Sequence, residues 1–247
     1  MAAFRDLRPT APLAPCPNAN KHADCVQCTV RTLSVCAALE PDEAGALEKL
    51  ARGMCFDAHQ TLFRQDEPAN SVYNITSGAI RLSKVLPDGR CQVVGFALPG
   101  DFLGLAMSDC NVFSADALTA TTVCQFRREA FSDLVDEKPH LLRRLYGAVS
   151  HELSLAHDQM CIIGRRTGDE KVAAFLVGLR ERWSRIDGSS VDIALPMTRQ
   201  DIADFLGLAI ETVSRKFSLL AKQKVIVIIP GGVRVLDVAQ LKVLAKV

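Results

Sequence analysis

The chain has 247 residues, of which 49% are hydrophobic, and a formal net charge of +1 at pH 7. This length favours one or two domains, and the apolar fraction is enough for well-packed cores. No apolar run approaches the roughly 18 residues that a membrane span needs, and no leader peptide is recognisable. We therefore expect a cytoplasmic protein that has no membrane partner.

The small net charge hides a difference between the two parts of the chain. Up to Ile163 the chain has 15 Lys and Arg residues and 19 Asp and Glu residues, whereas after Ile163 it has 14 Lys and Arg and 9 Asp and Glu. The C-terminal third is therefore the basic part. Such an excess of positive charge suits a partner with a phosphate backbone.

The first segment, up to about Cys36, is rich in Pro, Ala and Cys and has no helical or strand period. It contains Cys25, Cys28 and Cys36. Disulfides are rare in a reducing cytoplasm, so closely spaced cysteines indicate metal ligands or redox thiols. We expect this arm to have little order without its metal.

Short alternating runs separated by turn signals extend from Cys55 to about Phe126. Expected strands cover residues 73–76, 79–85 and 91–98, with turns at 77–78 and 87–89. Strands at this spacing indicate a small antiparallel barrel or roll.

After Pro139 the period becomes helical, and the segment 141–163 carries two stripes. The first is a continuous apolar face, which we expect to pack on the roll. Its members are Leu142, Leu145, Val149, Leu153, Ala156, Met160 and Ile163.

The second stripe has heptad spacing and is only half apolar. Its first positions are Leu141, Ala148, Leu155 and Ile162, and its alternate positions are Arg144, His151, Asp158 and Arg165. Polar groups on a helical seam fix register at a cost in stability, so this stripe suits a marginal dimerisation helix. A surface helix with scattered apolar residues is the alternative.

The box from Thr167 to Glu170 starts the next helix, because its side chains can satisfy free backbone amides. Residues 198–215 then have helix-turn-helix spacing, in which Gly207 permits the tight turn. The second helix presents side chains that can reach base edges in a major groove: Glu211, Ser214, Arg215 and Ser218. Segments 225–229 and 233–236 read as a two-stranded wing. A helical pair without nucleic acid is the alternative.

The order of roll, long helix, Gly207 turn, Glu211-Thr212-Val213-Ser214-Arg215 motif and wing resembles the CRP/FNR family of bacterial transcription regulators over essentially the whole chain. The resemblance implies an α+β protein and not an enzyme. A cysteine-rich cluster-binding arm (1–40) precedes a cyclic-nucleotide-binding-like antiparallel β-roll (41–138). A long dimerisation helix (139–166) leads to a C-terminal winged helix-turn-helix domain (167–247). The implied assembly is a homodimer on double-stranded DNA.

Two branches of that family compete. The cyclic-nucleotide branch needs an acidic residue after the turn at residues 100–104, where this chain has Leu105, Ala106 and Met107. It also needs a cation for the phosphate, yet no Arg or Lys lies between Ser108 and Thr122. We therefore expect no cyclic nucleotide. Ile210 and Ser214 in the recognition helix also agree with the FNR branch.

The FNR branch carries an oxygen-labile iron–sulfur cluster. Cys25, Cys28 and Cys36 resemble its three arm ligands, and Cys124 lies where the family places the fourth, so the resemblance implies a [4Fe-4S] cluster. The seven residues between Cys28 and Cys36 resemble a longer-spaced branch that also bears a cluster.

Other interpretations of the cysteines stay open. Zinc also accepts four cysteines, although its usual spacing pairs two CxxC motifs, and a thiol-disulfide sensor or an iron–sulfur electron carrier is a further alternative. Cys16 or Cys110 could replace an assigned ligand. We expect the five remaining cysteines to be small buried apolar residues: Cys16, Cys55, Cys91, Cys110 and Cys161.

The resemblance further implies an oxygen-responsive regulator, mainly an activator at low oxygen, with RNA polymerase as a partner and the turn at 87–89 as a candidate contact. Asp158 matches the family's dimer-limiting aspartate, because two facing copies would repel. The expected site is a TTGAT-N4-ATCAA palindrome. Base readers would be Glu211, Ser214 and Arg215, and phosphate contacts Thr198, Thr212 and Lys216.

Overall fold

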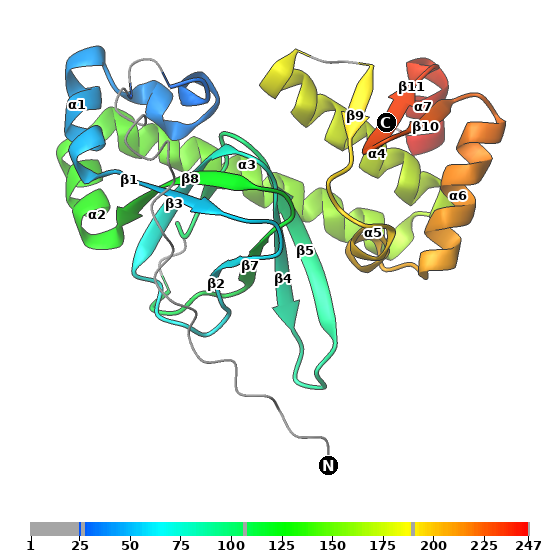
Figure 1. The fold of residues 1–247 in the computed structure, drawn as a ribbon, viewed down its shortest axis with the longest axis horizontal. Helices are drawn as coiled ribbons and strands as arrows, with labels where there is room; N and C mark the ends of the chain where they lie inside the picture. The colour runs from blue at the N-terminus through cyan, green and yellow to red at the C-terminus, as the bar shows by residue number, and fades with distance from the viewer. Residues whose placement is uncertain (1–24, 26–27, 106–107, 189–190, 247) are drawn as a thin grey trace.

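The computed structural model describes residues 25, 28–105, 108–188 and 191–246, apart from the side chains of residues 41, 42, 151 and 165. They form a β-roll and a C-terminal domain that share one long helix (Figure 1). The elements in chain order are η2 (Arg31–Leu33), η3 (Val35–Ala38), α1 (Pro41–Leu50), β1 (Arg52–Phe56), β2 (Thr61–Phe63), β3 (Ser71–Ser77), β4 (Ile80–Val85), β5 (Cys91–Ala97), β6 (Phe102–Leu103), β7 (Ser114–Ala117), β8 (Thr121–Arg127), α2 (Arg128–Glu137), α3 (Pro139–Arg165), α4 (Gly168–Asp187), β9 (Asp192–Ala194), α5 (Arg199–Leu206), α6 (Ile210–Lys222), β10 (Ile226–Ile229), β11 (Gly232–Val235) and α7 (Val238–Ala245).

The roll consists of two four-stranded antiparallel sheets, in the orders β1-β8-β3-β6 and β2-β7-β4-β5. Side chains alternate along each strand because successive residues of a strand face opposite sides. On β3, Tyr73 and Ile75 belong to the core inside the roll, whereas Val72 belongs to the cluster on the outer face. The predicted antiparallel roll is confirmed.

The outer face of the β1-β8-β3-β6 sheet is covered by short helices from the arm together with α1, α2 and the start of α3 (Figure 1). Val35 of η3, Phe126 of β8 and Leu141 of α3 share one buried cluster. The C-terminal part of the arm is thus built into the roll's surface.

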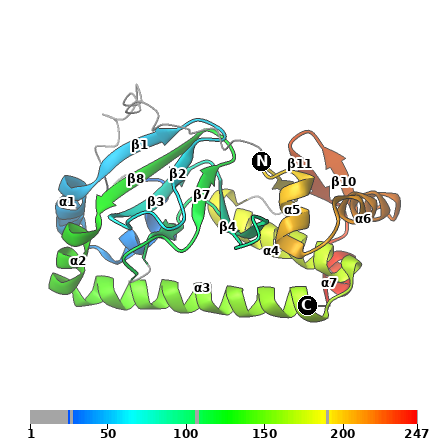
Figure 2. The same ribbon diagram turned by 90° about the horizontal axis from the view of Figure 1, so that it is seen from below.

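Helix α3 runs beneath both the roll and the C-terminal domain (Figure 2). This arrangement corrects the expectation that the first apolar stripe packs on the roll. Of that stripe only Leu145 is buried, and its other six members are exposed. Leu141 instead belongs to the roll-side cluster, while Ala148 and Ile162 pack against the two cores. The reason is that both domains lie on the same side of the helix and pack on Leu141, Ala148 and Ile162 of the second stripe.

The C-terminal domain contains α4 to α7 and a three-stranded sheet in the order β10-β11-β9. The predicted two-stranded wing therefore has a third strand, β9, whose Ile193 pairs with Val233 of β11. The capping box between Thr167 and Glu170 is present, and Gly207 ends α5 with φ +61°. That left-handed conformation favours glycine, so the predicted tight turn is confirmed.

The roll also packs directly on the helix-turn-helix. Phe96 of β5 lies 5.3 Å from Phe205 of α5 and 6.2 Å from Phe175 of α4, measured between ring centroids. Arg81 of β4 pairs with Asp201 of α5 at 2.8 Å. Within the part of the chain that the structure describes, no helix is both long and apolar enough to cross a membrane.

Candidate metal centre and nucleic-acid interface

The four cysteines predicted as ligands come from two distant parts of the chain. Cys25 and Cys28 precede η2, Cys36 lies in η3, and Cys124 is in the middle of β8. All four are half-buried and free. Cys124 is on the outer face of its sheet, the face that the arm covers, and Cys36 and Cys124 pack against the same apolar cluster.

The four thiols are close enough to influence one another electrostatically. Burial raises the pKa of Cys124 to about 12, and the negative charges of the other three cysteines add to the rise. Burial likewise raises the pKa of Cys25 to about 11, with Cys36 as the next cause. The raised pKa values keep these groups protonated without metal, so the thiolate form needs a cationic partner, which iron would supply.

Two kinds of metal centre bind four cysteines at different spacings. Among the described residues, no group of three or more His, Cys, Asp or Glu side chains is arranged to hold one metal ion. Zinc draws its four ligands to a single point, with Zn–S distances of about 2.3 Å. A cubic four-iron cluster binds one cysteine at each iron and so holds its ligands farther apart. Four half-buried cysteines are a donor set that fits a four-iron cluster, and the choice between a cluster and a zinc ion stays a prediction.

Polar groups surround the cysteines on the protein side. The backbone amide of Cys36 donates to Ser34 Oγ at 3.2 Å, and the amide Nδ2 of Asn74 lies 4.0 Å from Cys36 Sγ. Asn74 stands directly opposite Cys124 in the β3–β8 register. The backbone amide of Cys25 donates to a carboxylate oxygen of Glu48 at 3.4 Å.

The expectation that the remaining cysteines are buried apolar residues is wrong for four of them. Cys91, Cys110 and Cys161 are exposed, and Cys55 forms a disulfide. Cys16 lies outside the described residues. Cys110 forms an isolated antiparallel β-bridge with Pro68. The neighbouring thiols that raise the pKa of Cys124 are those of Cys28, Cys25 and Cys36. Isolated cysteines carry no pattern in the sequence from which their exposure could be read.

Helix α6 presents the predicted base-reading residues to solvent. Glu211, Ser214 and Arg215 are exposed, whereas Val213 and Phe217 are buried against the rest of the domain. This division follows from the helical period, because residues three and four apart share one face. Arg215 bends back along the helix, where its Nη2 donates to Thr212 Oγ1 at 3.3 Å.

The predicted phosphate-contacting residues differ in how free they are. Thr198 is the N-cap of α5, and its hydroxyl donates to Asp201 at 2.6 Å. Thr212 is half-buried and accepts from Arg215. Lys216 forms an ion pair with Asp169 of α4 at 2.7 Å, so part of its charge is already neutralised.

Comparison with known proteins agrees with this two-part architecture. The family model of the cyclic nucleotide-binding domain matches residues 54–138, and that of the Crp-like helix-turn-helix domain matches residues 170–244. The chain is 50% identical over 218 residues to the transcriptional activatory protein AadR of Rhodopseudomonas palustris, covering 88% of this chain and 91% of the relative. It is also 50% identical over 221 residues to the nitrogen fixation regulation protein FixK of Bradyrhizobium diazoefficiens, covering 90% of this chain and 93% of the relative.

The chain belongs to the CRP/FNR family of transcription regulators. Among solved structures, FixK2 from Bradyrhizobium japonicum superposes with a TM-score of 0.73 at 33% identity, over 78% of this chain and 96% of that one. The family consists of DNA-binding regulators, so this CRP/FNR-family regulator is not an enzyme.

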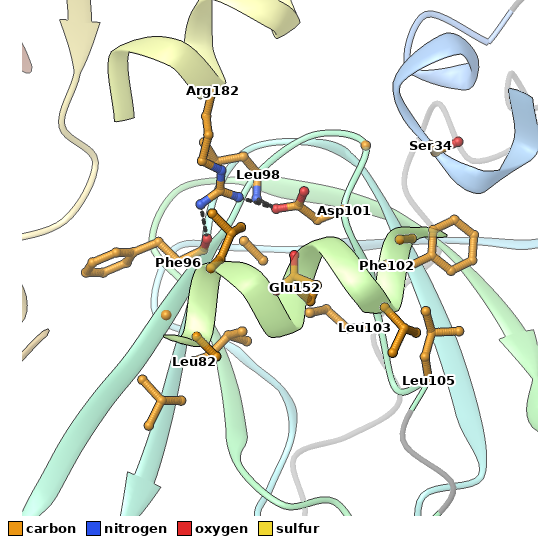
Figure 3. A pocket seen from close by; sticks show the side chains of 18 of the residues that line it. Ser34, Leu82, Phe96, Leu98, Asp101, Phe102, Leu103, Leu105, Glu152 and Arg182 are labelled. Atoms are coloured by element: carbon orange, nitrogen blue, oxygen red, sulfur yellow. Dashed lines mark hydrogen bonds and ion pairs between the residues drawn. The ribbon is translucent and has the colours of Figure 1, made fainter. Parts of the chain in front are cut away.

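This CRP/FNR-family regulator has a cavity of about 1610 Å³ between the roll, α3 and α4 (Figure 3). Arg182 of α4 reaches into it, where it donates to the carbonyl oxygen of Phe96 at 2.7 Å and pairs with Asp101. Asp101 in turn accepts from the backbone amide of Leu98 at 2.8 Å. Arg128 donates to the carbonyl oxygens of Gly104 and Ser108. The guanidinium groups of Arg182 and Arg128 are thus hydrogen-bonded to acceptors of the protein itself. The expectation that no cyclic nucleotide binds here stays a prediction.

The predicted dimer-switch residues lie on α3 of the regulator. Leu155 and Asp158 are exposed and line the same cavity. Ala148 and Ile162 are half-buried against the molecule's own cores, and the side chain of His151 lies outside the described part of the structure. Among the described side chains of the second stripe, those exposed to a partner are therefore Arg144, Leu155 and Asp158.

Proposed function

We propose that this regulator is an oxygen-responsive transcription activator that binds DNA as a homodimer when a [4Fe-4S] cluster is held by its four half-buried cysteines. The observation that carries the proposal is the convergence of Cys25, Cys28 and Cys36 from the arm on Cys124 of β8, within one electrostatic neighbourhood. The relative AadR is described as a transcriptional activatory protein, which supports activation as the mode of control.

The arm and the dimer helix are in contact, which supports a link between cluster and assembly. Cys36 lies in η3, and η3 packs against α3. Val35 shares a buried cluster with Leu141 and Leu145 of α3. The cluster would supply the sensitivity to oxygen. The chain's own part is to hold η3 on the first turns of α3 while the thiolates are bound. Without the cluster the thiols regain their protons, because burial raises the pKa of Cys25 and Cys124, and they no longer tie the arm to β8.

Assembly as a homodimer follows in this proposal from the exposed surface of α3. Two separate faces of the helix remain open: the outer apolar stripe and the face with Leu155 and Asp158. We propose that Asp158 limits dimerisation, because two facing carboxylates repel each other. Two recognition helices of such a dimer would read two half-sites one DNA turn apart, with a TTGAT-N4-ATCAA palindrome as the proposed sequence.

RNA polymerase is the proposed further partner, with the turn at residues 87–89 as the candidate contact. This turn joins β4 and β5 and carries the exposed pair of Asp88 with Arg90. Such a regulator acts on the chromosome, so we place it in the cytoplasm.

Anaerobic purification tests the proposed cluster directly. We expect a brown protein with about four iron and four sulfide per chain, which bleaches in air and binds the palindrome only before bleaching. Cys124→Ser should lose the iron and the colour, because its side chain is one of four required thiolates. Cys110→Ser is the matched control, since Cys110 is exposed and should keep both. A colourless wild-type protein that contains one zinc ion would refute the cluster.

A further inference from the structure

Asn74 is a buried polar residue on the outer face of the β1-β8-β3-β6 sheet. Its exposed fraction is 2%, and it lies in the middle of β3. Its neighbours on the same face of the strand are Val72, which packs into the outer cluster with Phe126, and Thr76, whose hydroxyl is hydrogen-bonded to that of Thr122. An aliphatic side chain would satisfy that environment, so packing alone does not explain an amide here.

The side chain of Asn74 is directed at the cysteine cluster. It pairs in register with Cys124 on the neighbouring strand, and its Nδ2 lies 4.0 Å from Cys36 Sγ. The same amide therefore adjoins one cysteine from the arm and one from the roll. These are the two parts of the chain that the cluster would join.

The other end of the amide has no such partner. Asn74 Oδ1 is buried and has no hydrogen bond to any of the described residues. Buried polar atoms are paired in the great majority of cases, and leaving one unpaired destabilises the fold. An asparagine kept for backbone structure would use its carbonyl oxygen, whereas this one uses its N–H groups toward sulfur.

We infer that Asn74 donates an N–H···S hydrogen bond to the Cys36 ligand and thereby sets the reduction potential of the proposed cluster. The inference rests on the proposed function. A thiolate can only accept a hydrogen bond, so the bound state fixes the amide with Nδ2 toward the sulfur. Hydrogen bonds to the sulfurs stabilise the more negative, reduced state of such a cluster and so raise its potential.

The test replaces Asn74 by leucine, which has a similar volume and no N–H donor. The protein is reconstituted anaerobically as the full chain, and its midpoint potential is measured by spectroelectrochemical titration. We expect the potential of Asn74→Leu to shift to a more negative value than that of the wild type, at equal iron and sulfide content. Bleaching under a fixed concentration of dioxygen, which takes electrons from the cluster, should become faster.

Two further variants make the result decisive. Ser83→Ala removes a buried polar group from the other sheet and should leave the potential unchanged. Asn74→Ala removes the same donor without adding bulk, so it replaces the leucine variant if that one does not fold. An unchanged potential in a folded Asn74 variant overturns the inference. So does a folded Asn74 variant that binds no cluster, because Asn74 would then hold the ligands together instead of tuning them.

The same experiment separates this inference from the proposed function. If the wild-type protein takes up no iron–sulfur cluster, the proposed function fails and the role of Asn74 fails with it. If the wild type holds the cluster and the Asn74 variants match its potential, only the role of Asn74 fails.

Discussion

Arg215 and Lys216 are neighbours on α6, yet their side chains have different partners. Arg215 is exposed, and within the part of the chain that the structure describes its hydrogen bonds go to its own helix, to Thr212 Oγ1 and the carbonyl oxygen of Glu211. Lys216 is held by Asp169 of α4. Arg215 can therefore swing toward a base without breaking a tertiary contact, whereas Lys216 cannot.

Arg215→Ala should weaken binding to the palindrome by about 1–3 kcal/mol and relax discrimination at the guanine that it reads, because a bidentate contact to one base is lost. Fluorescence anisotropy with cognate and single-substituted duplexes measures both effects. Equal losses on cognate and scrambled duplexes would contradict base reading. Lys216→Ala serves as the comparison and should weaken binding to all duplexes alike, as expected for a phosphate contact.

At the scale of one element, α3 shows that periodicity finds a stripe but not the direction in which it faces. The exposed stripe has heptad spacing, with Tyr146, Leu153 and Met160 alternating with Leu142, Val149, Ala156 and Ile163. An unpartnered apolar seam of this length is typical of a helix that pairs with another helix. Asp158 lies on a different side of α3, because it is two residues from both Ala156 and Met160.

Exchanging one residue on each face of α3 decides which face forms the dimer. Asp158→Ala should give a dimer that binds DNA in air, because the repulsion between the two carboxylates is removed. Leu153→Glu places a charge on the outer stripe, where the leucine is 57% exposed, and should leave the monomer folded. Both variants are measured by analytical ultracentrifugation with and without oxygen.

The outcomes of the two exchanges differ clearly. An aerobic monomer for Asp158→Ala would refute the role of Asp158. A monomer for Leu153→Glu under anaerobic conditions would assign the interface to the outer stripe. Ser154→Glu adds a carboxylate four residues from Asp158, on the same side of α3, and should weaken only a dimer that uses that face.

At the scale of the whole molecule, the roll and the helix-turn-helix are joined by more than the linker. The guanidinium of Arg81 on β4 bridges Asp116 of the roll at 3.0 Å and Asp201 of α5 at 2.8 Å. Gln92 of β5 donates to the backbone of α5 at Asp204. Together with the rings of Phe96 and Phe205, these contacts hold α5 against the roll.

Arg81→Ala should lower the free energy of unfolding by about 1–2 kcal/mol, less than the 3–5 kcal/mol of a fully buried pair. We expect less than the effect of a fully buried pair because the Arg81 side chain is 33% exposed and so is screened by water, although that of Asp201 is only 6% exposed. Hydrogen exchange of the α5 amides should increase as well. Arg90→Ala in the same hairpin is the control, since its pair with Asp88 is exposed and should contribute little. Unchanged exchange in α5 would show that the aromatic contacts alone hold the helix.

This bridge also predicts a pH dependence. Burial acts to raise the pKa of Asp201, but hydrogen bonds from Thr198 and Arg81 outweigh it, and the pKa lies below the usual 3.8. A carboxyl with a lowered pKa stabilises the fold above its unfolded pKa and loses that effect as the pH falls through the folded one. Urea unfolding should therefore show a wild-type advantage over Arg81→Ala that is complete above about pH 4 and shrinks below it. An advantage that persists at pH 2 would show that packing, rather than the ion pair, is responsible.

The sequence was sufficient for features that depend on neighbours in the chain. The turn at Gly207, the capping box at Thr167 and the division of α6 into buried and exposed faces follow from local chemistry and the helical period. The identity of the four cysteines came from the family resemblance, because nothing in the spacing of Cys124 connects it to the arm.

Other features depend on which parts of the chain meet, and only the tertiary structure decided them. The two domains lie on one side of α3 and pack on part of its second stripe, which leaves the first stripe exposed except for Leu145. The three-residue strand β9 becomes part of the wing only through its pairing with β11. The position of Asn74 next to the cysteines could not be predicted from the sequence, because a single polar residue in a strand forms no recognisable pattern. Its place beside Cys36 and Cys124 exists only once β3, β8 and the arm are packed together, since contacts between residues distant in the chain are set by folding and not by local pattern.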